Sequence, residues 1–337
     1  MRRSGGRAPT TTCRRAPRLV ALVVALGVAG AAFATPGGAV RRTRPAACRA
    51  PGPTAPVAEP VGASDTVLRF TVTLVDRRRS TPAIPHRPAL PCRSLPTVVR
   101  IPAAGTGPFP LLVVAHGRDN DPSSLAALLG SWADAGYVVA APTFPTTSKD
   151  RNGNPQRSES VAQAADMRFV VDRMLAMSGA AGASPLRGLV DGRHVGAAGM
   201  SLGGLAVYGL VSNTCCRDRR VSAAILLAAV RRDFPDERYE KNRAPVMLVQ
   251  GDADPGYHNS VEAYPELAPP KWFVTLNGSQ HSPPFEVPPG PEAPLVYATT
   301  ADFWDRYLKD DRAAAARITT AIAASGGRAT LRRDLGP

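Results

Sequence analysis

Residues 194–204, His-Val-Gly-Ala-Ala-Gly-Met-Ser-Leu-Gly-Gly, decide how the rest of this sequence is interpreted. A short apolar run at 195–198 leads into a G-x-S-x-G pattern centred on Ser201, and a second apolar run follows directly. This order predicts a strand, a sharp turn and a helix, which together expose the serine hydroxyl above a sheet. Gly199 and Gly203 suit the close approach of strand and helix, where a side chain would collide. The pattern favours a nucleophilic serine over the alternative, a glycine-rich turn around a buried serine.

An acid and a base follow the predicted nucleophile, each directly after a predicted strand. The apolar run 246–250 leads to Asp252 and Asp254, and the run 271–276 leads to a polar loop that contains His281. A serine hydroxyl is a weak nucleophile until a base takes its proton. The order Ser, Asp, His is the one expected for a serine on a strand-turn-helix corner. We predict Asp254 as the acid and His281 as the base, with Asp252 as a turn or capping residue.

The other histidines are given different roles. His86 and His194 are expected to be exposed, and His258 is the rival to His281 as the base because it lies four residues past the acid. His116 lies in a predicted oxyanion loop, which we expect it to brace by hydrogen bonding.

The end of an early apolar run, 111–115, supplies the predicted oxyanion loop. His116 and Gly117 follow this run, and the glycine lets the backbone bend sharply and present N–H groups. We predict the backbone N–H groups of Arg118 and Leu202 as the donors to a developing oxyanion. Loss of one such donor typically costs ~2.7–4 kcal/mol of transition-state stabilisation.

The net charge of +14 is concentrated at the amino terminus. Residues 1–60 hold ten arginines and a single acid, Glu59, which leaves a net charge of only +5 on the rest of the chain. The sequence contains no basic helix interleaved with aromatic residues and no nucleic-acid motif, so it argues against a nucleic-acid partner.

A targeting segment accounts for many of these arginines. Several arginines precede an apolar run at 19–34 that ends in Ala32-Phe33-Ala34, which is the pattern of a cleavable secretory signal peptide over residues 1–34. We therefore expect a secreted protein, with an uncleaved amino-terminal membrane anchor as the alternative and the export route left open. Residues 35–63 are rich in Pro, Ala, Gly and Arg without apolar periodicity, which predicts a disordered linker.

Four cysteines remain after the predicted signal peptide: Cys48, Cys92, Cys215 and Cys216. They allow three pairings, and the sequence does not choose among them. Neither cysteine nor histidine residues have the spacing of a structural zinc site, so no metal is expected.

Strands and helices are expected to alternate over a single catalytic domain, residues 64–325, followed by a tail at 326–337. The expected strands are 66–75, 95–101, 111–115, 137–141, 195–198, 221–229, 246–250 and 271–276, and the expected helices are 121–135, 158–177, 205–211, 259–267, 297–308 and 312–323. This alternation is typical of a mostly parallel α/β sheet with helices on both faces. The first two strands are expected to form an antiparallel edge. Only fifteen residues, 230–244, lie where a lid would be inserted, so we expect an open site.

Taken together, these motifs resemble those of the α/β-hydrolase superfamily. The matching segments are His116-Gly117, Gly199-Met200-Ser201-Leu202-Gly203-Gly204, Gly251-Asp252-Ala253-Asp254, Gly278-Ser279-Gln280-His281 and the helix at 165–172. Within the superfamily, the chain is most similar to secreted bacterial serine esterases of the dienelactone-hydrolase-like, platelet-activating-factor-acetylhydrolase-like and cutinase-like (polyester hydrolase) group. Two positions depart from that group: Ser201 replaces the cysteine of dienelactone hydrolases, and Arg118 stands where polyester hydrolases commonly have an aromatic or apolar residue.

The resemblance implies an α/β-hydrolase fold without a sizeable lid domain. It also implies that a Ser201–His281–Asp254 triad cleaves carboxylic esters through an acyl-enzyme, without a metal or organic cofactor. The expected partner is a small-molecule, lipid or polymeric ester, and a lipid substrate would bring a monomeric enzyme into transient contact with a lipid surface. An acyltransferase or a peptidase would use the same triad, and a catalytically inactive binding protein could use the same scaffold. Acyl-chain length and activity on polymers are left open.

Overall fold

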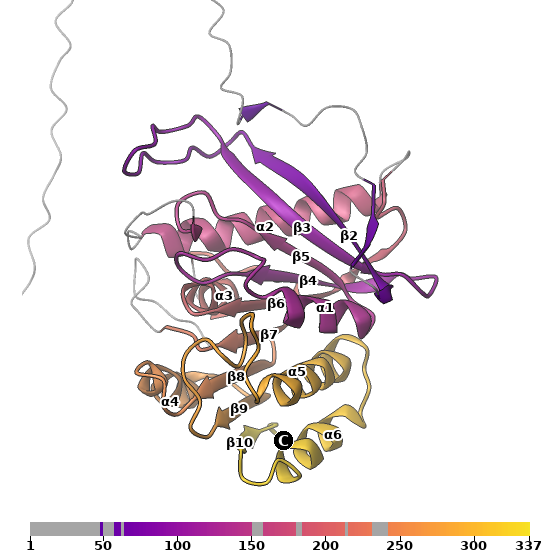
Figure 1. Cartoon of the computed structure of the whole chain (residues 1–337), viewed down its shortest axis with the longest axis vertical. Helices are drawn as coiled ribbons and strands as arrows, with labels where there is room; N and C mark the ends of the chain where they lie inside the picture. The colour runs from indigo at the N-terminus through magenta and orange to yellow at the C-terminus, as the bar shows by residue number, and fades with distance from the viewer. Residues whose placement is uncertain are drawn as a thin grey trace, which may run out of the picture. The chain divides into compact units, whose positions relative to one another are not determined.

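The computed structural model describes residues 48–49, 57–61, 64–149, 158–179, 184–212, 215–230 and 242–337 (Figure 1). The predicted signal peptide at 1–34 and most of the predicted linker at 35–63 lie outside the described residues. Residues 231–241, which make up most of the segment where a lid would be inserted, also lie outside the described residues. No helix in the described ranges is both long and apolar enough to cross a membrane.

Within the described chain, a ten-stranded sheet has the order β1-β2-β3-β5-β4-β6-β7-β8-β9-β10 (Figure 1). Its strands are β1 Glu59–Val61, β2 Ser64–Asp76, β3 Arg93–Pro102, β4 Phe109–Ala115, β5 Val138–Pro142, β6 Val190–Met200, β7 Val221–Leu227, β8 Val246–Gly251, β9 Lys271–Leu276 and β10 Ala329–Asp334. Strands β5, β4, β6, β7, β8 and β9 are parallel, whereas β1, β2, β3 and β10 pair antiparallel with their neighbours. The protein is therefore an α/β protein with a mostly parallel sheet. The antiparallel edge that the sequence predicts is confirmed in the β2/β3 pair.

Helices pack on both faces of the sheet, as the alternating pattern predicts. They are α1 Ala126–Asp134, α2 Ser158–Gly179, α3 Leu202–Ser212, α4 Tyr257–Glu266, α5 Ala293–Leu308 and α6 Ala314–Ala323. Successive side chains of a strand point to opposite faces. Leu111 and Val113 of β4 join the core under α2, α3 and α4, whereas Leu112 and Val114 join the core under α1, α5 and α6. Burial on both faces explains why β4 is apolar throughout rather than alternating.

The prediction of a disordered linker over residues 35–63 is wrong for its carboxy-terminal end. Residues Glu59–Val61 form β1, which pairs antiparallel with β2 through Pro60 and Leu68. A disulfide also joins Cys48 to Cys92, the residue that precedes β3. Composition could not reveal this strand, because β1 is largely exposed and is held by backbone pairing rather than by an apolar face.

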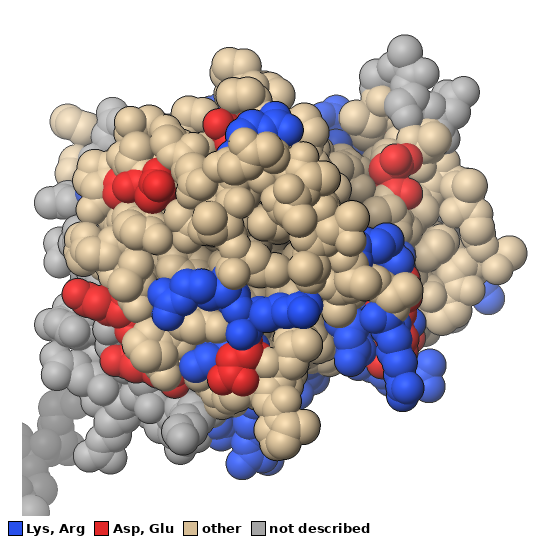
Figure 2. Space-filling view, turned by 90° about the horizontal axis from the view of Figure 1, so that it is seen from below, with Lys and Arg blue, Asp and Glu red and all other residues tan. Residues whose placement is uncertain are grey.

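The predicted carboxy-terminal tail is also wrong, because residues 329–334 form the edge strand β10. The Arg332 guanidinium lies 4.6 Å from the ring centre of Tyr264, and that of Arg333 lies 5.4 Å from the ring centre of Trp272. Figure 2 views the end of the molecule at which β10 and α6 lie in Figure 1 and shows basic side chains gathered there. A charged strand at a sheet edge carries no alternating apolar pattern, and charges at such an edge oppose pairing with other chains.

Helix α1 begins at Ala126, later than the expected start at residue 121. Asp121 accepts hydrogen bonds from the backbone N–H and the hydroxyl of Ser123. These contacts hold residues 122–125 in turns before the helix begins.

Candidate active site

Ser201 occupies the corner between β6 and α3. Its φ is 54°, a strained value for a residue with a side chain. Its N–H donates to the carbonyl of Leu227 on β7 (2.9 Å), and its own carbonyl accepts the N–H of Leu205 in α3 (3.1 Å). A Cβ atom on Gly199 would lie 2.2 Å from the carbonyl oxygen of Gly203, so only glycine permits this approach of strand and helix. The predicted order of strand, sharp turn and helix is therefore confirmed for the backbone.

Asp254 and His281 are in direct contact. Nδ1 of His281 lies 2.6 Å from Oδ2 of Asp254. The two residues follow β8 and β9, which are parallel neighbours and so end at the same edge of the sheet. Asp254 is buried and its Oδ1 accepts the N–H of Gly256 at 2.7 Å, whereas the His281 side chain is 36% exposed. A buried carboxylate thus orients an imidazole that a ligand can reach.

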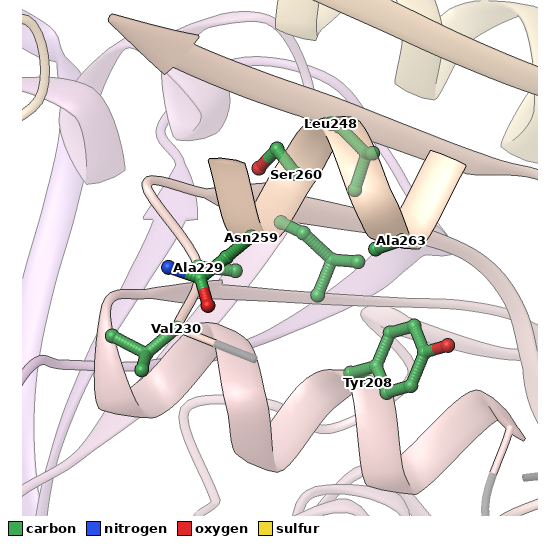
Figure 3. Close-up of a pocket in the computed structure, with 8 residues that line it drawn as sticks. Tyr208, Ala229, Val230, Leu248, Asn259, Ser260 and Ala263 are labelled. Carbon is green, nitrogen blue, oxygen red and sulfur yellow. The ribbon is translucent and has the colours of Figure 1, made fainter. Parts of the chain in front are cut away.

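Gln250 and Ser260, which the sequence patterns did not predict, extend this pair into the core. Gln250 on β8 donates from Nε2 to Oδ2 of Asp254, and the Ser260 hydroxyl donates to Oε1 of Gln250 at 2.8 Å. Gln250 is fully buried, and a buried amide requires such partners. Ser260 also lines a small pocket between α3 and α4, together with Tyr208 (Figure 3). A lone polar residue in the apolar run 246–250 is the signal by which Gln250 could have been found.

The loop after β4 lies against the nucleophile corner. A Cβ atom on Gly117 would lie 3.3 Å from Cβ of Ser201. In the described part of the chain, neither the Arg118 N–H nor the Leu202 N–H donates to a backbone carbonyl in a turn or loop. Leu202 is the first residue of α3, and a first-turn N–H has no partner inside its own helix. Neither predicted donor is therefore taken up by such a carbonyl.

His116 is bonded on both ring nitrogens. Nδ1 lies 2.7 Å from the carbonyl oxygen of Gly117, and Nε2 accepts the backbone N–H of Phe144 at 3.0 Å. Burial lowers the pKa of His116 to about 4. The ring is therefore neutral near pH 7 and carries its proton on Nδ1, which donates to the carbonyl. These contacts tie the oxyanion loop to the segment after β5 and leave no ring nitrogen for proton transfer.

The hydroxyl of Ser201 and the imidazole of His281 are not hydrogen-bonded within the described residues. Hydrogen bonds of this kind are often long in an unliganded site and tighten when substrate binds. The rival base, His258, is exposed on α4 and its Nδ1 contacts the carbonyl of Pro255 at 3.1 Å. Asp252 accepts the N–H of Gly278 at 2.6 Å, which is the turn role expected from its sequence position.

No group of three or more His, Cys, Asp or Glu side chains among the described residues could hold a metal ion. No protein-family model matches this sequence, and no curated protein matches it significantly.

Proposed function

We propose that this protein is a serine hydrolase of the α/β-hydrolase superfamily that cleaves carboxylic esters. The observation that carries the proposal is the strained corner at Ser201, where φ is 54°, at the sheet edge that also holds the hydrogen-bonded Asp254–His281 pair. A mostly parallel sheet with helices on both faces is the architecture that this superfamily implies. Backbone N–H groups beside the corner add support, because an acyl-transfer site needs donors for its oxyanion.

In this proposal, His281 takes the proton of the Ser201 hydroxyl as the oxygen attacks the ester carbonyl carbon. The N–H groups of Arg118 and Leu202 stabilise the negative charge that develops on the carbonyl oxygen. His281 then passes its proton to the departing alkoxide, which leaves the acyl group on Ser201. Water attacks the acyl-enzyme, with His281 as base, and releases the acid. Asp254 orients the imidazole and stabilises its protonated form without taking the proton itself.

We also propose that the enzyme is exported, as its amino-terminal sequence predicts. Support comes from two disulfides, Cys48–Cys92 and Cys215–Cys216. Disulfides form and persist mainly in oxidising compartments outside the cytosol.

Hydrolysis of p-nitrophenyl esters, from acetate to palmitate, tests the proposed activity. Wild-type protein should release p-nitrophenol, and Ser201→Ala should lower kcat by up to about 10⁶-fold. Ser80→Ala, which alters an exposed serine in the loop between β2 and β3, serves as the control and should keep the wild-type rate. Folded wild-type protein that hydrolyses none of these esters, or a Ser201→Ala variant with the wild-type rate, would contradict the proposal.

A further inference from the structure

Glu286, in the loop between β9 and α5, contacts both loops that flank the proposed nucleophile. Its Oε1 accepts a hydrogen bond from Nδ2 of Asn120 at 2.6 Å. Asn120 lies two residues after Arg118, in the oxyanion loop. The hydroxyl of Ser282, the residue that follows His281, also acts on the Glu286 carboxylate, where it opposes the rise in pKa caused by burial. One side chain thus bridges the oxyanion loop and the loop of the proposed base.

Backbone contacts support the same connection. The N–H of Val287 donates to the carbonyl of Ser124 at 2.8 Å, and the N–H of Glu286 donates to the carbonyl of Ser282 at 3.0 Å. The Asn120 amide is fixed from its own side as well, because its Oδ1 accepts the N–H of Asp121 at 3.0 Å. Both ends of the bridge are therefore held by their own loops, and the carboxylate joins them beside the Val287–Ser124 backbone contact.

We infer that Glu286 is a positioning residue that clamps the His281 loop to the oxyanion loop. The inference rests on the proposed function, since it concerns how the base and the Arg118 N–H are placed around one substrate. Proton transfer and oxyanion binding require donor and acceptor atoms within about 3 Å of the reacting atoms, and small misplacements are costly.

The surroundings of Glu286 are those of a side chain held in place. Burial raises the pKa of Glu286, while the Ser282 hydroxyl, the neighbouring His281 and the Asn120 amide act in the opposite direction. A half-buried carboxylate needs hydrogen-bond partners to offset the loss of water. Hydrogen bonds to an ionised acceptor are also about twice as strong as neutral ones, which suits a clamp.

Kinetics of Glu286→Ala and Glu286→Gln on p-nitrophenyl acetate test the clamp. Glu286→Ala should lower kcat about tenfold with little change in KM, because it removes hydrogen bonds to a charged group. Glu286→Gln should restore most of the rate and keep the wild-type pH profile, because an amide oxygen can still accept from Asn120. Glu292→Ala alters the other carboxylate of the same loop and should behave as wild type.

Amide hydrogen exchange provides a readout that does not depend on turnover. Glu286→Ala should speed exchange in both loops, residues 116–124 and 281–290, whereas Glu286→Gln should leave it close to wild type. Wild-type kcat and exchange in Glu286→Ala would overturn the clamp, and so would an equal loss of rate in both variants, since that would assign the effect to charge. Inactive wild-type protein would contradict the proposed function alone, and the exchange data would still decide whether the clamp exists.

Discussion

Two buried aspartates, Asp166 and Asp254, have different partners. Asp166 on α2 is fully buried and receives two hydrogen bonds from Arg93, at 2.8 and 2.6 Å. The Arg79 guanidinium also lies 2.8 Å from the Asp166 carboxylate. Asp254 is equally out of solvent, but its partner is the imidazole of His281 at 2.6 Å.

The partner decides what each carboxylate can do. A guanidinium keeps its proton under all ordinary conditions, so the Asp166 cluster is a permanent ion pair that fastens α2 to the β2–β3 edge. An imidazole can accept a proton from a reacting group and pass it on, which a guanidinium cannot do. The Arg93 side chain is only 3% exposed, whereas that of His281 is 36% exposed and open to a ligand. We therefore assign the first carboxylate to stability and the second to chemistry.

Asp254→Asn should have the largest effect on activity. It keeps the shape of the side chain but favours the wrong tautomer of His281, so kcat should fall about 10⁴-fold. Urea unfolding should give a midpoint close to that of wild type. A rate within tenfold of wild type would remove the distinction between the two aspartates.

Asp166→Asn should lower stability and leave kcat nearly unchanged, which is the opposite of Asp254→Asn. It removes the nearest carboxylate from the buried Arg93 and leaves only the more distant Glu159, at 3.8 Å, which should lower the free energy of unfolding by about 3–5 kcal/mol. The kcat of the folded fraction, measured at low temperature, should stay near the wild-type value. A large loss of kcat in protein that unfolds at the wild-type urea concentration would contradict the structural role.

His116 sharpens the comparison because it is a buried histidine that does not act as a base. Its folded-state pKa is lowered from 6.5 to about 4, so the unfolded chain binds the proton more readily between these values. The contribution of neutral His116 to the free energy of unfolding is fully present above about pH 6.5. It is lost as the pH falls towards about 4, and the total loss is about 3 kcal/mol.

Urea unfolding from about pH 7 to about pH 4 measures this contribution. His116→Gln can keep both hydrogen bonds but cannot bind the proton, so it should lose less stability on acidification than wild type. Parallel pH dependences of the two proteins would show that His116 is not held in its neutral form.

Gln250→Leu should have the smallest effect of the four. It removes the buried donor to Asp254 and leaves the Ser260 hydroxyl without its acceptor. Asp254 keeps its contacts with His281 and Gly256, so kcat should fall only about tenfold. Ser260→Ala should lower kcat less than Gln250→Leu does, because it leaves the contact between Gln250 and Asp254 in place. An unchanged kcat in Gln250→Leu would mean that His281 and Gly256 are enough to orient the carboxylate.

Local sequence patterns were sufficient to predict the Asp254–His281 contact and the sharp backbone turn at Ser201. Ser201, Asp254 and His281 each come shortly after an apolar run that forms a parallel strand. Parallel strands bring their carboxyl ends to one edge, so a correct strand prediction also places the residues that follow. The mostly parallel sheet followed from the same runs.

Contacts between distant residues could not be predicted in this way. Arg93 and Asp166 are 73 positions apart, and Asn120 and Glu286 are 166 apart, so no local pattern contains either pair. Strand β1 is largely exposed, and β10 packs only Ala329 and Leu331 on the core, so neither has the extended buried face that strand prediction uses. The pairing of Cys48 with Cys92 was open for the same reason, because the two residues are 44 positions apart.

Labelling with a fluorophosphonate, followed by peptide mass mapping, tests most directly whether the Asp254–His281 pair activates Ser201. The expected result is one adduct on the peptide that contains Ser201, which is absent in Ser201→Ala and much slower to form in Asp254→Asn. Asp166→Asn should be labelled at nearly the wild-type rate while it is folded. Folded wild-type protein that stays unlabelled, or an adduct on a different serine, would contradict the proposed nucleophile.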